Sequence, residues 1–337
     1  MLFFMNSNKM FFFFILFFST LISISSNSWF GCWIGLEINL LSFIPLISNS
    51  NNLLSNEASL KYFLTQSIAS INFLFMILLK LFFLKNFFFN NFMSIMINSS
   101  LFMKMGSAPF HFWFPNVMEG LSWLNNFILM SWQKIAPMIL LSYYFNMMFL
   151  MLILILNSIV GAIGGFNQTS LRKILAFSSI NNLSWILISM LISENLWMFY
   201  FLFYSFLIMI MCFFFNIFNM FFINQIYILN FNPLMKFFLM INLLSLGGLP
   251  PLIGFFPKWI IINFMLINNL QIICFIFIMM SLILLFFYIR IFYSSLMFNY
   301  MKLKWMKTYI KNWNYKMINL LSIISIMGMI LSTFFFY

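Results

Sequence analysis

Charged residues are scarce in this chain of 337 residues, since lysine, arginine, aspartate and glutamate together make up only 6% of it. A soluble globular domain normally has about a quarter of its residues charged. Hydrophobic residues account for 64% of the chain, and its mean hydropathy is +1.06. The scarcity of charge excludes a soluble domain and predicts an integral membrane protein.

Residues that bind metals and nucleotides are also rare. The three cysteines (Cys32, Cys212 and Cys274) lie scattered in apolar runs without a CxxC spacing, and one histidine is present. This pattern excludes iron–sulfur and zinc sites. The run GAIGGFNQTSLRK (161–173) lacks the preceding strand and the spacing of a phosphate-binding loop, so it indicates a helix exit. We therefore predict no metal and no cofactor in this chain.

The net charge of +12 at pH 7 is the kind of excess that can indicate nucleic-acid binding. Here the basic residues fall mostly in connections that flank the apolar runs. We therefore expect them to lie at the membrane surface beside lipids, and we predict no nucleic-acid partner.

About eleven apolar runs of near-membrane length follow one another, joined by connections rich in asparagine, serine and glycine. The predicted spans are 10–26, 28–48, 57–82, 93–112, 119–145, 147–165, 171–192, 196–222, 236–265, 270–293 and 317–337. The predicted fold class is an all-α integral membrane protein with about eleven transmembrane helices. We expect one transmembrane domain over residues 1–337.

Basic residues support this count of spans. With eleven spans most of them fall at one membrane face, including Lys236 and the lysines of the connection 294–316, whereas Lys80 and Lys85 fall at the other. The positive-inside rule then predicts the N-terminus on the cytoplasmic-type side, which is the matrix in a mitochondrion. Because the number of spans is odd, the C-terminus is predicted on the opposite side, which is the intermembrane space in a mitochondrion.

Two of the apolar runs break with the same spacing of glycine and proline. The breaks read KMGSAPFHFWFP (104–115) and GLPPLIGFFPK (248–258), and the shared glycines, Gly106 and Gly248, are offset by 142 positions (248 − 106). A proline inside a membrane helix frees a backbone carbonyl and splits or kinks the helix. The breaks lie five spans apart, so their helices cross with opposite polarity, as in the inverted repeats of secondary transporters. Chance recurrence is the alternative.

Four ionisable residues lie well inside predicted spans: Glu37, Lys104, Lys134 and Lys258. Each costs roughly 2.5–3.5 kcal/mol at a helix centre on insertion scales, so such residues indicate a functional site. Glu37 can offset much of this cost by pairing with Lys104. A lysine in a low-dielectric surrounding can lose and regain a proton near neutral pH, which suits a proton carrier. Structural ion pairs and snorkelling side chains remain open as alternatives.

Other polar residues have simpler interpretations. Glu57 and Lys61 are four residues apart at a helix start, which predicts a helix-entry pair. Lys80 and Lys85 are expected to snorkel at a helix end. His111 lies within the first break, where it can either relay a proton between the neighbouring lysines or hydrogen-bond to the interrupted backbone.

Five ordered motifs carry a resemblance to a known family: EASLKYFLTQ (57–66), MGSAPFHFWFP (105–115), WQKIAP (132–137), GAIGGFNQTSLRK (161–173) and SLGGLPPLIGFFPKW (245–259). Over nearly the whole chain, the sequence closely resembles the subunit 2 family of mitochondrial NADH:ubiquinone oxidoreductase (complex I). It is similar to the shortened animal form, which lacks three N-terminal helices of the fourteen-span antiporter-like fold.

The resemblance implies a proton-translocating subunit of the complex I membrane arm, in the mitochondrial inner membrane, related to Mrp-type cation/proton antiporters. Glu37 and Lys104 would be its paired glutamate and lysine, Lys134 its central-axis lysine, and Lys258 the lysine of the second broken helix. Redox chemistry, with FMN, iron–sulfur clusters and ubiquinone, would belong to partner subunits. Other membrane-arm subunits, including neighbouring antiporter-like subunits, and lipids would surround the chain.

One position departs from this family pattern. Where many relatives carry histidine, this chain has Asn182, in SSINNLSW. An amide does not carry a proton at neutral pH, so water or His111 would have to replace any relay there.

Two rival functions remain. A stand-alone cation/proton antiporter would use the same lysines without partners, and a structural subunit would tolerate the loss of all four intramembrane charges. Moving a proton against 100 mV costs about 2.3 kcal/mol. Because the sequence shows no nucleotide fingerprint, we expect this energy to arrive through contact with a partner or from another ion's gradient.

Overall fold

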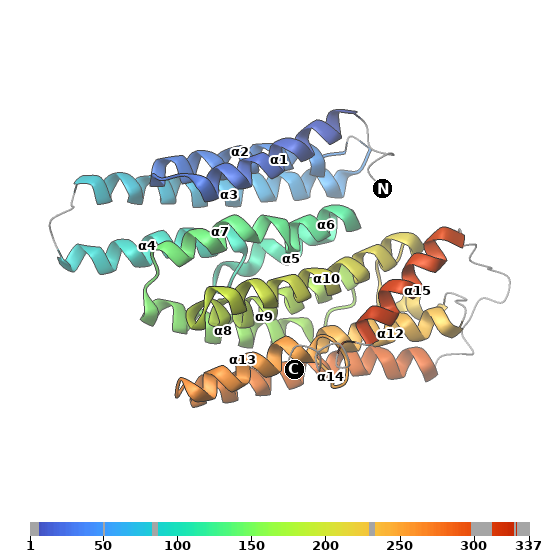
Figure 1. The fold of residues 1–337 in the computed structure, drawn as a ribbon. Coiled ribbons are helices and arrows are strands. Elements are labelled where there is room, and N and C mark those ends of the chain that lie inside the picture. Colours follow the sequence, from blue (N-terminus) through green and yellow to red (C-terminus); the bar gives the residue numbers. More distant parts are fainter. Residues whose placement is uncertain are drawn as a thin grey trace. The chain divides into compact units, whose positions relative to one another are not determined.

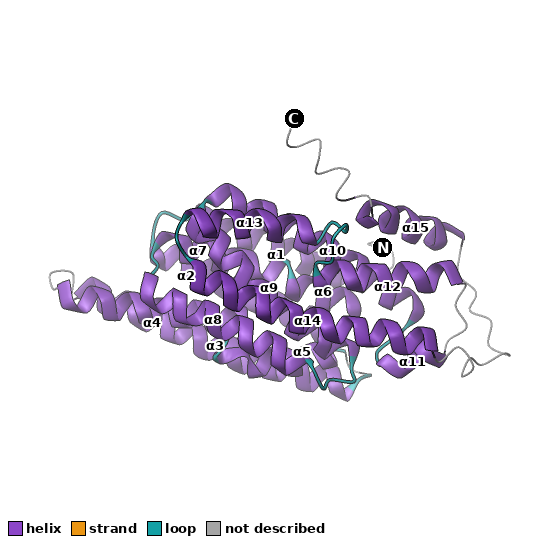
Figure 2. Cartoon of the chain, turned by 90° about the horizontal axis from the view of Figure 1, so that it is seen from below, coloured by secondary structure: helices purple, strands orange, loops and turns teal. Residues whose placement is uncertain are grey.

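The computed structural model describes residues 7–49, 51–82, 87–228, 233–297, 312–326 and 328. Helices make up nearly all of this part of the chain, which contains no strand and only an isolated bridge between Ser170 and Phe222 (Figure 2). The predicted all-α fold class is confirmed. Lys85, the lysines at 302–311 and, in the last predicted span, residues 327 and 329–337 lie outside the described residues.

The chain divides into two compact units, Met1–Ile153 and Leu154–Tyr337, and helix α8 (Met147–Gly165) crosses the boundary between them. The prediction of one domain stays a prediction. The other helical elements of the first unit are α1 (Ser7–Ser25), α2 (Trp29–Ile47), α3 (Leu53–Phe82), α4 (Phe87–Met105), the 3-10 turn η2 (Phe110–Phe112), α5 (Trp113–Gly120), α6 (Trp123–Met130) and α7 (Trp132–Tyr143).

Within the first unit, α1, α2 and α3 lie side by side (Figure 1). Helix α3 also contacts α4 and α5, and α4 contacts α7. Helix α2 begins where the Ser28 hydroxyl accepts a hydrogen bond from the backbone N–H of Gly31 at 3.2 Å, a typical N-cap. These contacts bring the predicted charged residues of α2, α4 and α7 into one bundle.

The second unit is built around α9. Its helices are α9 (Leu171–Ile192), α10 (Glu194–Phe218), α11 (Ile223–Ile228), α12 (Pro233–Gly247), α13 (Phe255–Ile267), α14 (Gln271–Met297) and α15 (Asn312–Ile326). Helix α9 contacts α10, α13 and α14, and 83% of its apolar window is buried, against 28% for α14. A membrane helix that is buried almost all round is the expected place for internal polar side chains.

Within the residues that the structure describes, seven helices are long and apolar enough to cross a membrane: Ser7–Ser25, Trp29–Ile47, Leu53–Phe82, Met147–Gly165, Leu171–Ile192, Glu194–Phe218 and Gln271–Ser295. They coincide with predicted spans one to three, six to eight and ten. The fourth and ninth spans are broken, as predicted, because α4 ends at Met105 and α12 ends at Gly247.

The fifth predicted span, 119–145, is not the continuous helix that we expected. It consists of α6 and α7 with Ser131 between them, at φ −110° and ψ −74°. Pro137 lies inside α7, where it lacks the N–H that would bond to the preceding turn. The Ser131 hydroxyl bonds to the Phe127 carbonyl at 2.6 Å, which helps to satisfy the backbone at the interruption.

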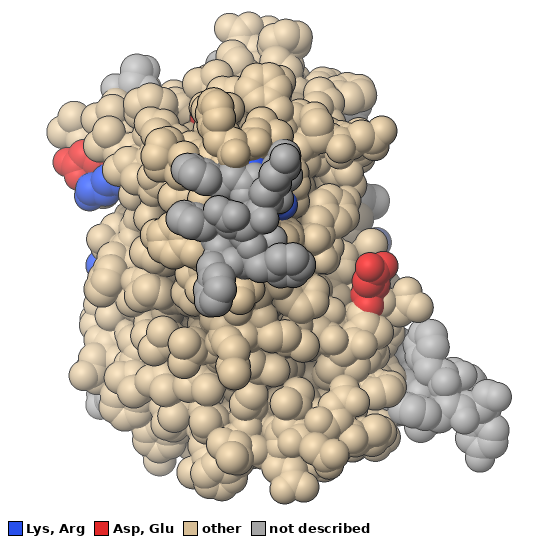
Figure 3. Space-filling view, turned by 90° about the vertical axis from the view of Figure 1, so that its left-hand side faces the viewer, with Lys and Arg blue, Asp and Glu red and all other residues tan. Residues whose placement is uncertain are grey.

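The exterior is apolar, as a membrane protein requires. On α1, for example, Phe11, Phe14 and Phe18 are each about three-fifths exposed. Figure 3 shows one face of the molecule, on which few charged side chains interrupt an uncharged surface. Lipid, rather than water, is the solvent that suits such a surface.

Candidate functional site

The first break ends α4 with a left-handed glycine. Gly106 has φ +70°, its N–H bonds to the Met103 carbonyl at 3.2 Å, and the N–H of Ser107 bonds to the Phe102 carbonyl at 3.1 Å. This pair of bonds is the Schellman motif, which satisfies the last carbonyls of a helix. The glycine of the sequence pattern is therefore required by the backbone.

The second break ends α12 in the same way. Gly248 has φ +87° and bonds to the Ser245 carbonyl at 3.0 Å, and the N–H of Leu249 bonds to the Leu244 carbonyl at 3.3 Å. In both breaks the peptide bond before the first shared proline is cis. The sequence repeat therefore corresponds to a repeated backbone arrangement. The opposite polarity of the two copies stays a prediction.

Lys258 lies against the second break. It belongs to α13, is 6% exposed, and its Nζ donates a hydrogen bond to the Gly247 carbonyl at 2.9 Å. That carbonyl is at the C-terminal end of α12, where the helix dipole favours a positive charge. A Cβ on Gly248 would lie 3.0 Å from the same Nζ, so the glycine also makes room for the ammonium group.

Lys104 lies in the last turn of α4, directly before the first break. It is 8% exposed, and among the described residues its Nζ has no hydrogen-bond partner. The half-buried carboxylate of Glu37 interacts with it electrostatically, and the Phe73 ring centroid lies 6.0 Å from Nζ. The predicted pair is therefore coupled through space, while a direct hydrogen bond between them is absent.

Lys134 is the most deeply buried of the predicted residues, at 1% exposed. It lies in the first turn of α7, and its backbone N–H bonds to the Ser131 carbonyl at the interruption. Its Nζ lies 5.1 Å from the centroid of the Phe114 ring, within the range of a cation–π contact. The interruption at Ser131 thus lies immediately beside this lysine, just as a break lies beside Lys104 and Lys258.

Lys104 and Lys134 line the same cavity of the first unit. Its volume is about 20 Å³, which is room for one water. Its polar lining further includes Asn39, Tyr62, Gln66 and Gln133. The fold therefore brings together two lysines that are 30 residues apart in the sequence (134 − 104).

The amides in this cavity were not found by the sequence analysis. Gln133 donates to the Asn39 side-chain oxygen at 2.9 Å, and Gln66 donates to the Lys104 carbonyl at 3.1 Å. Gln133 is adjacent to Lys134 in WQKIAP and Gln66 closes the motif EASLKYFLTQ. The sequence signal for these amides was a polar residue inside an apolar run. We applied that signal only to charged side chains.

Lys258 lines a second cavity, in the second unit, of the same volume of about 20 Å³. The polar side chains that share it are Asn182, Tyr200 and Tyr204. Tyr200 donates a hydrogen bond to the Asn182 side-chain oxygen at 3.2 Å. Asn182, the residue at which the sequence departs from the family pattern that it resembles, thus faces the same space as the lysine of the second break.

His111 lies in η2 and is half-buried, and its ring centroid is 4.3 Å from that of Phe112. It does not line the cavity that Lys104 and Lys134 share. Its role as a relay stays a prediction.

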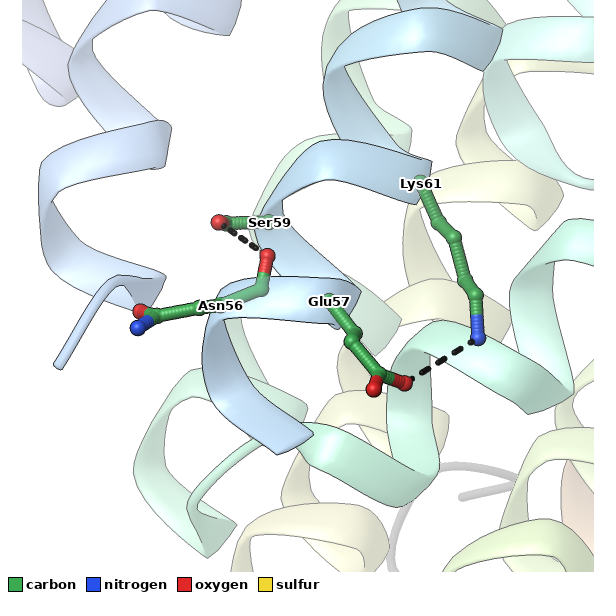
Figure 4. A network of polar contacts seen from close by, with 4 residues as sticks. All are labelled: Asn56, Glu57, Ser59 and Lys61. Atoms are coloured by element: carbon green, nitrogen blue, oxygen red, sulfur yellow. Dashed lines mark hydrogen bonds and ion pairs between the residues drawn. The ribbon is translucent and has the colours of Figure 1, made fainter. Parts of the chain in front are cut away.

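Two surface predictions can be compared with the structure. Glu57 and Lys61 form the expected pair on the first turns of α3, with 3.8 Å between charged atoms and both side chains more than half exposed (Figure 4). Lys80 lies in the last turn of α3, over the rings of Tyr144, at 3.8 Å, and Trp29, at 5.4 Å, and its snorkelling stays a prediction. The charge of Lys80 is therefore held by aromatic rings at the end of α3.

One buried lysine was missed. Lys236, predicted at a membrane face, is 6% exposed inside α12, and its Nζ donates to the Ser295 carbonyl of α14. The side chain is therefore covered by a neighbouring helix, and the membrane face at which Lys236 lies stays a prediction. A position within the first turns of a helix can still be covered by a neighbouring helix.

Comparisons with known proteins identify the family. A family model described as NADH:quinone oxidoreductase/Mrp antiporter, transmembrane, matches residues 26–285. NADH-ubiquinone oxidoreductase chain 2 of Anopheles gambiae is 51% identical, with 95% of each chain covered. The chain belongs to the NADH-ubiquinone oxidoreductase chain 2 family. The chain 2 proteins of Locusta migratoria (46% identical, covering 98% of this chain and 97% of that protein) and Bos taurus (38%, covering 85% and 86%) are also similar.

Solved structures share the fold of this chain 2 family member. A chain of respiratory complex I from Thermus thermophilus superposes with a TM-score of 0.77 at 18% identity, covering 97% of this chain and 79% of that one. A chain of the Mrp complex from a Dietzia species gives 0.72 at 14% identity, covering 82% and 58%. The fold is therefore the antiporter-like membrane fold, and the protein is a multi-pass membrane protein.

Proposed function

We propose that this chain is a proton-translocating membrane-arm subunit of complex I, and that its buried lysines form the proton path. NADH:ubiquinone electron transfer takes place in other subunits and drives the pumping. Membership of the chain 2 family supports the assignment to the complex. The observation that carries the proton path is the cavity that Lys104 and Lys134 share, because two lysines on one small polar space have no simple structural purpose.

Two lysines on one cavity influence each other's charge. Ammonium groups at close range repel, so a proton on one favours the release of a proton from the other. Glu37 adds a negative charge that acts on Lys104, and any movement of its carboxylate changes this balance. Lys134, held at 1% exposure, has no bulk water to stabilise its charge. A small displacement near Glu37 can therefore change the proton occupancy of Lys134.

The cavity amides provide a route for a proton between Lys104 and Lys134. The side chains of Asn39, Gln66 and Gln133 both donate and accept hydrogen bonds, so they can hold a water between the two lysines. The protonated lysine then gives a proton to this water, and the water gives one of its own protons to the neutral lysine. Apolar side chains, among them Leu36, Leu40 and Phe114, line most of the remaining space, which limits other water.

The second unit continues the path at Lys258. We propose that the change at Lys134 passes toward Lys258 and on to a neighbouring antiporter-like subunit. The Gly247 carbonyl stabilises the protonated form of Lys258, so this lysine can hold a proton until the next change in the complex. The energy, about 2.3 kcal/mol for each proton against 100 mV, comes from the redox subunits by contact.

The cellular setting follows from the same proposal. The protein would lie in the mitochondrial inner membrane with its N-terminus in the matrix and its C-terminus in the intermembrane space. Its partners would be other membrane-arm subunits and lipids. FMN, the iron–sulfur clusters and ubiquinone would be bound by partner subunits.

Native gel electrophoresis of gently solubilised membranes tests the assignment. Mass spectrometry should locate this chain in the same very large band that an in-gel NADH dehydrogenase stain reveals. Migration as a small species without that activity would contradict it. That result would favour a stand-alone antiporter, for which the shared family model with Mrp antiporters gives a specific reason. Ion exchange by the isolated chain in liposomes would then be the next measurement.

A further inference from the structure

We propose that the Tyr200 hydroxyl is a positioning group for the proton of Lys258 and that Asn182 sets the direction of that hydroxyl. The inference deepens the proposed function and rests on it, because it assigns roles within the second cavity. Asn182 comes from α9, Tyr200 from α10 and Lys258 from α13, and all three line that cavity. They are 4%, 3% and 6% exposed, so their hydrogen bonds have to be made inside the unit.

The direction of the Tyr200 hydroxyl follows from its hydrogen bond. A phenol has one hydrogen to donate and lone pairs that accept. Tyr200 donates its hydrogen to the Asn182 side-chain oxygen at 3.2 Å. Its oxygen is therefore left as an acceptor, and the cavity is the space that it borders together with Lys258.

The protonated lysine needs such an acceptor. An ammonium group has three hydrogens to donate, and the Gly247 carbonyl accepts one of them at 2.9 Å. The cavity holds about 20 Å³, enough for one water between the ammonium group and the Tyr200 oxygen. Acceptors favour the protonated amine over the neutral one, because the neutral amine has fewer hydrogens to donate.

Among the described residues, two further tyrosines, and Cys212 next to one of them, bear on the second cavity. Tyr204, also of α10, lines the cavity, but its hydroxyl interacts with Ser179 of α9. Tyr288 of α14 lies beside Gly247, where a Cβ would be 3.4 Å from its ring. The lining of the cavity includes no aspartate, glutamate, arginine or second lysine. Tyr200 is thus the hydroxyl that Asn182 orients, and no carboxylate in that lining competes for the proton.

The test is NADH-driven proton pumping per electron by the assembled complex in membrane vesicles, measured with a pH-sensitive dye across the neutral pH range. In Tyr200→Phe, Lys258 should lose its proton more easily, so the alkaline fall in pumping should move to lower pH. A shift of about half to one pH unit is the size that one neutral hydrogen bond supports. A wild-type pH profile in Tyr200→Phe would overturn the proposal.

Asn182→Leu provides the second variant, in case the first does not assemble. It should shift the profile in the same direction, and the double variant should shift no further than Tyr200→Phe alone, because both act through one hydroxyl. Additive shifts would contradict the proposed order. Tyr227→Phe is the matched control, since it removes a hydroxyl bonded to Ser294 at 2.6 Å outside the cavity, and its profile should be unchanged.

Lys258→Met separates this inference from the proposed function. If Lys258→Met pumps normally, the proton path through Lys258 is wrong. If Lys258→Met loses pumping while Tyr200→Phe keeps the wild-type profile, only the role of Tyr200 is wrong.

Discussion

The two breaks share a backbone but differ in where they place the charge. Lys104 precedes the first break, and the position at the same offset (246 − 104) is Leu246, which lines the second cavity. Lys258 follows the second break, and its counterpart in the first is the exposed Asn116. The two copies of the repeat therefore end a helix in the same way. They differ in which side chain lies beside the backbone carbonyls at that helix end.

The use that each unit makes of its break also differs. In the second unit the lysine is bonded to the carbonyl that ends the helix. In the first unit the lysine depends on the field of Glu37 and shares its cavity with Lys134. Under the proposed function, the first unit would respond to a charge change, and the second would hold a proton. Four predictions test this difference, ordered from the largest expected effect.

Gly254→Ala should prevent the subunit from accumulating in the complex. A Cβ there would lie 1.8 Å from the backbone oxygen of Ser245, which the surrounding helices cannot move aside. The counterpart in the first break (254 − 142) is Phe112, which is 74% exposed. Phe112→Ala should therefore assemble normally, as measured by the amount of chain in the NADH-staining band. Equal amounts of the two variant chains in the NADH-staining band would show that the two breaks are packed alike.

Gly248→Ala should lower proton pumping per electron more than Gly106→Ala. Both glycines have positive φ, so each alanine costs about 1–2 kcal/mol in the left-handed region. The new methyl group at 248 would also meet the Lys258 ammonium at 3.0 Å, whereas the one at 106 meets the Phe114 side chain at 2.9 Å. Stoichiometry and assembly should be measured on the same vesicles. A greater pumping loss in Gly106→Ala would contradict the role of the Lys258–Gly247 bond.

Asn39→Leu should slow proton pumping by a smaller amount. It leaves the Gln133 amide without its acceptor in the first cavity, at a cost of about 1–3 kcal/mol for a buried polar group. The rate of pumping at saturating NADH is the measurement. Asn125→Leu is a control in the same unit, because its amide bonds to the Leu46 carbonyl and does not line the cavity. A larger pumping loss in the control would argue against the cavity.

Lys61→Met should have no measurable effect on pumping. The Lys61–Glu57 pair is exposed, and pairs of this kind contribute little in water. The variant removes a lysine without touching a cavity, so it is the charge-matched control for Lys104→Met. Reduced stoichiometry in Lys61→Met would mean that net charge, rather than buried position, determines pumping.

Much of this arrangement could be predicted from the sequence. The length and polarity of apolar runs define membrane helices, and glycine followed by proline three residues later predicts a helix end followed by a turn. The interruption at Ser131 could not be predicted in this way, because serine is tolerated inside membrane helices and Pro137 lies six residues further on. The break is seen only in the structure, where α6 and α7 are separate helices that pack against each other.

The candidate sites were predicted in part. Charge inside an apolar run identified Lys104, Lys134 and Lys258, because a buried charge is costly wherever it lies. Neutral amides and hydroxyls carry a smaller penalty, so Gln133, Tyr200 and their partners gave no comparable signal. Which polar residues meet in one cavity depends on contacts between helices distant in the sequence. The burial of Lys236 depends on α14 in the same way.

The most direct test of the account is the number of protons pumped per electron by a complex that contains Lys134→Ala. NADH oxidation and proton uptake should be measured together in vesicles, with Lys61→Ala as the control. The account predicts reduced stoichiometry in Lys134→Ala and, if coupling is tight, slower quinone reduction as well. Normal stoichiometry in an assembled Lys134→Ala complex would contradict a proton path through the cavity of the first unit.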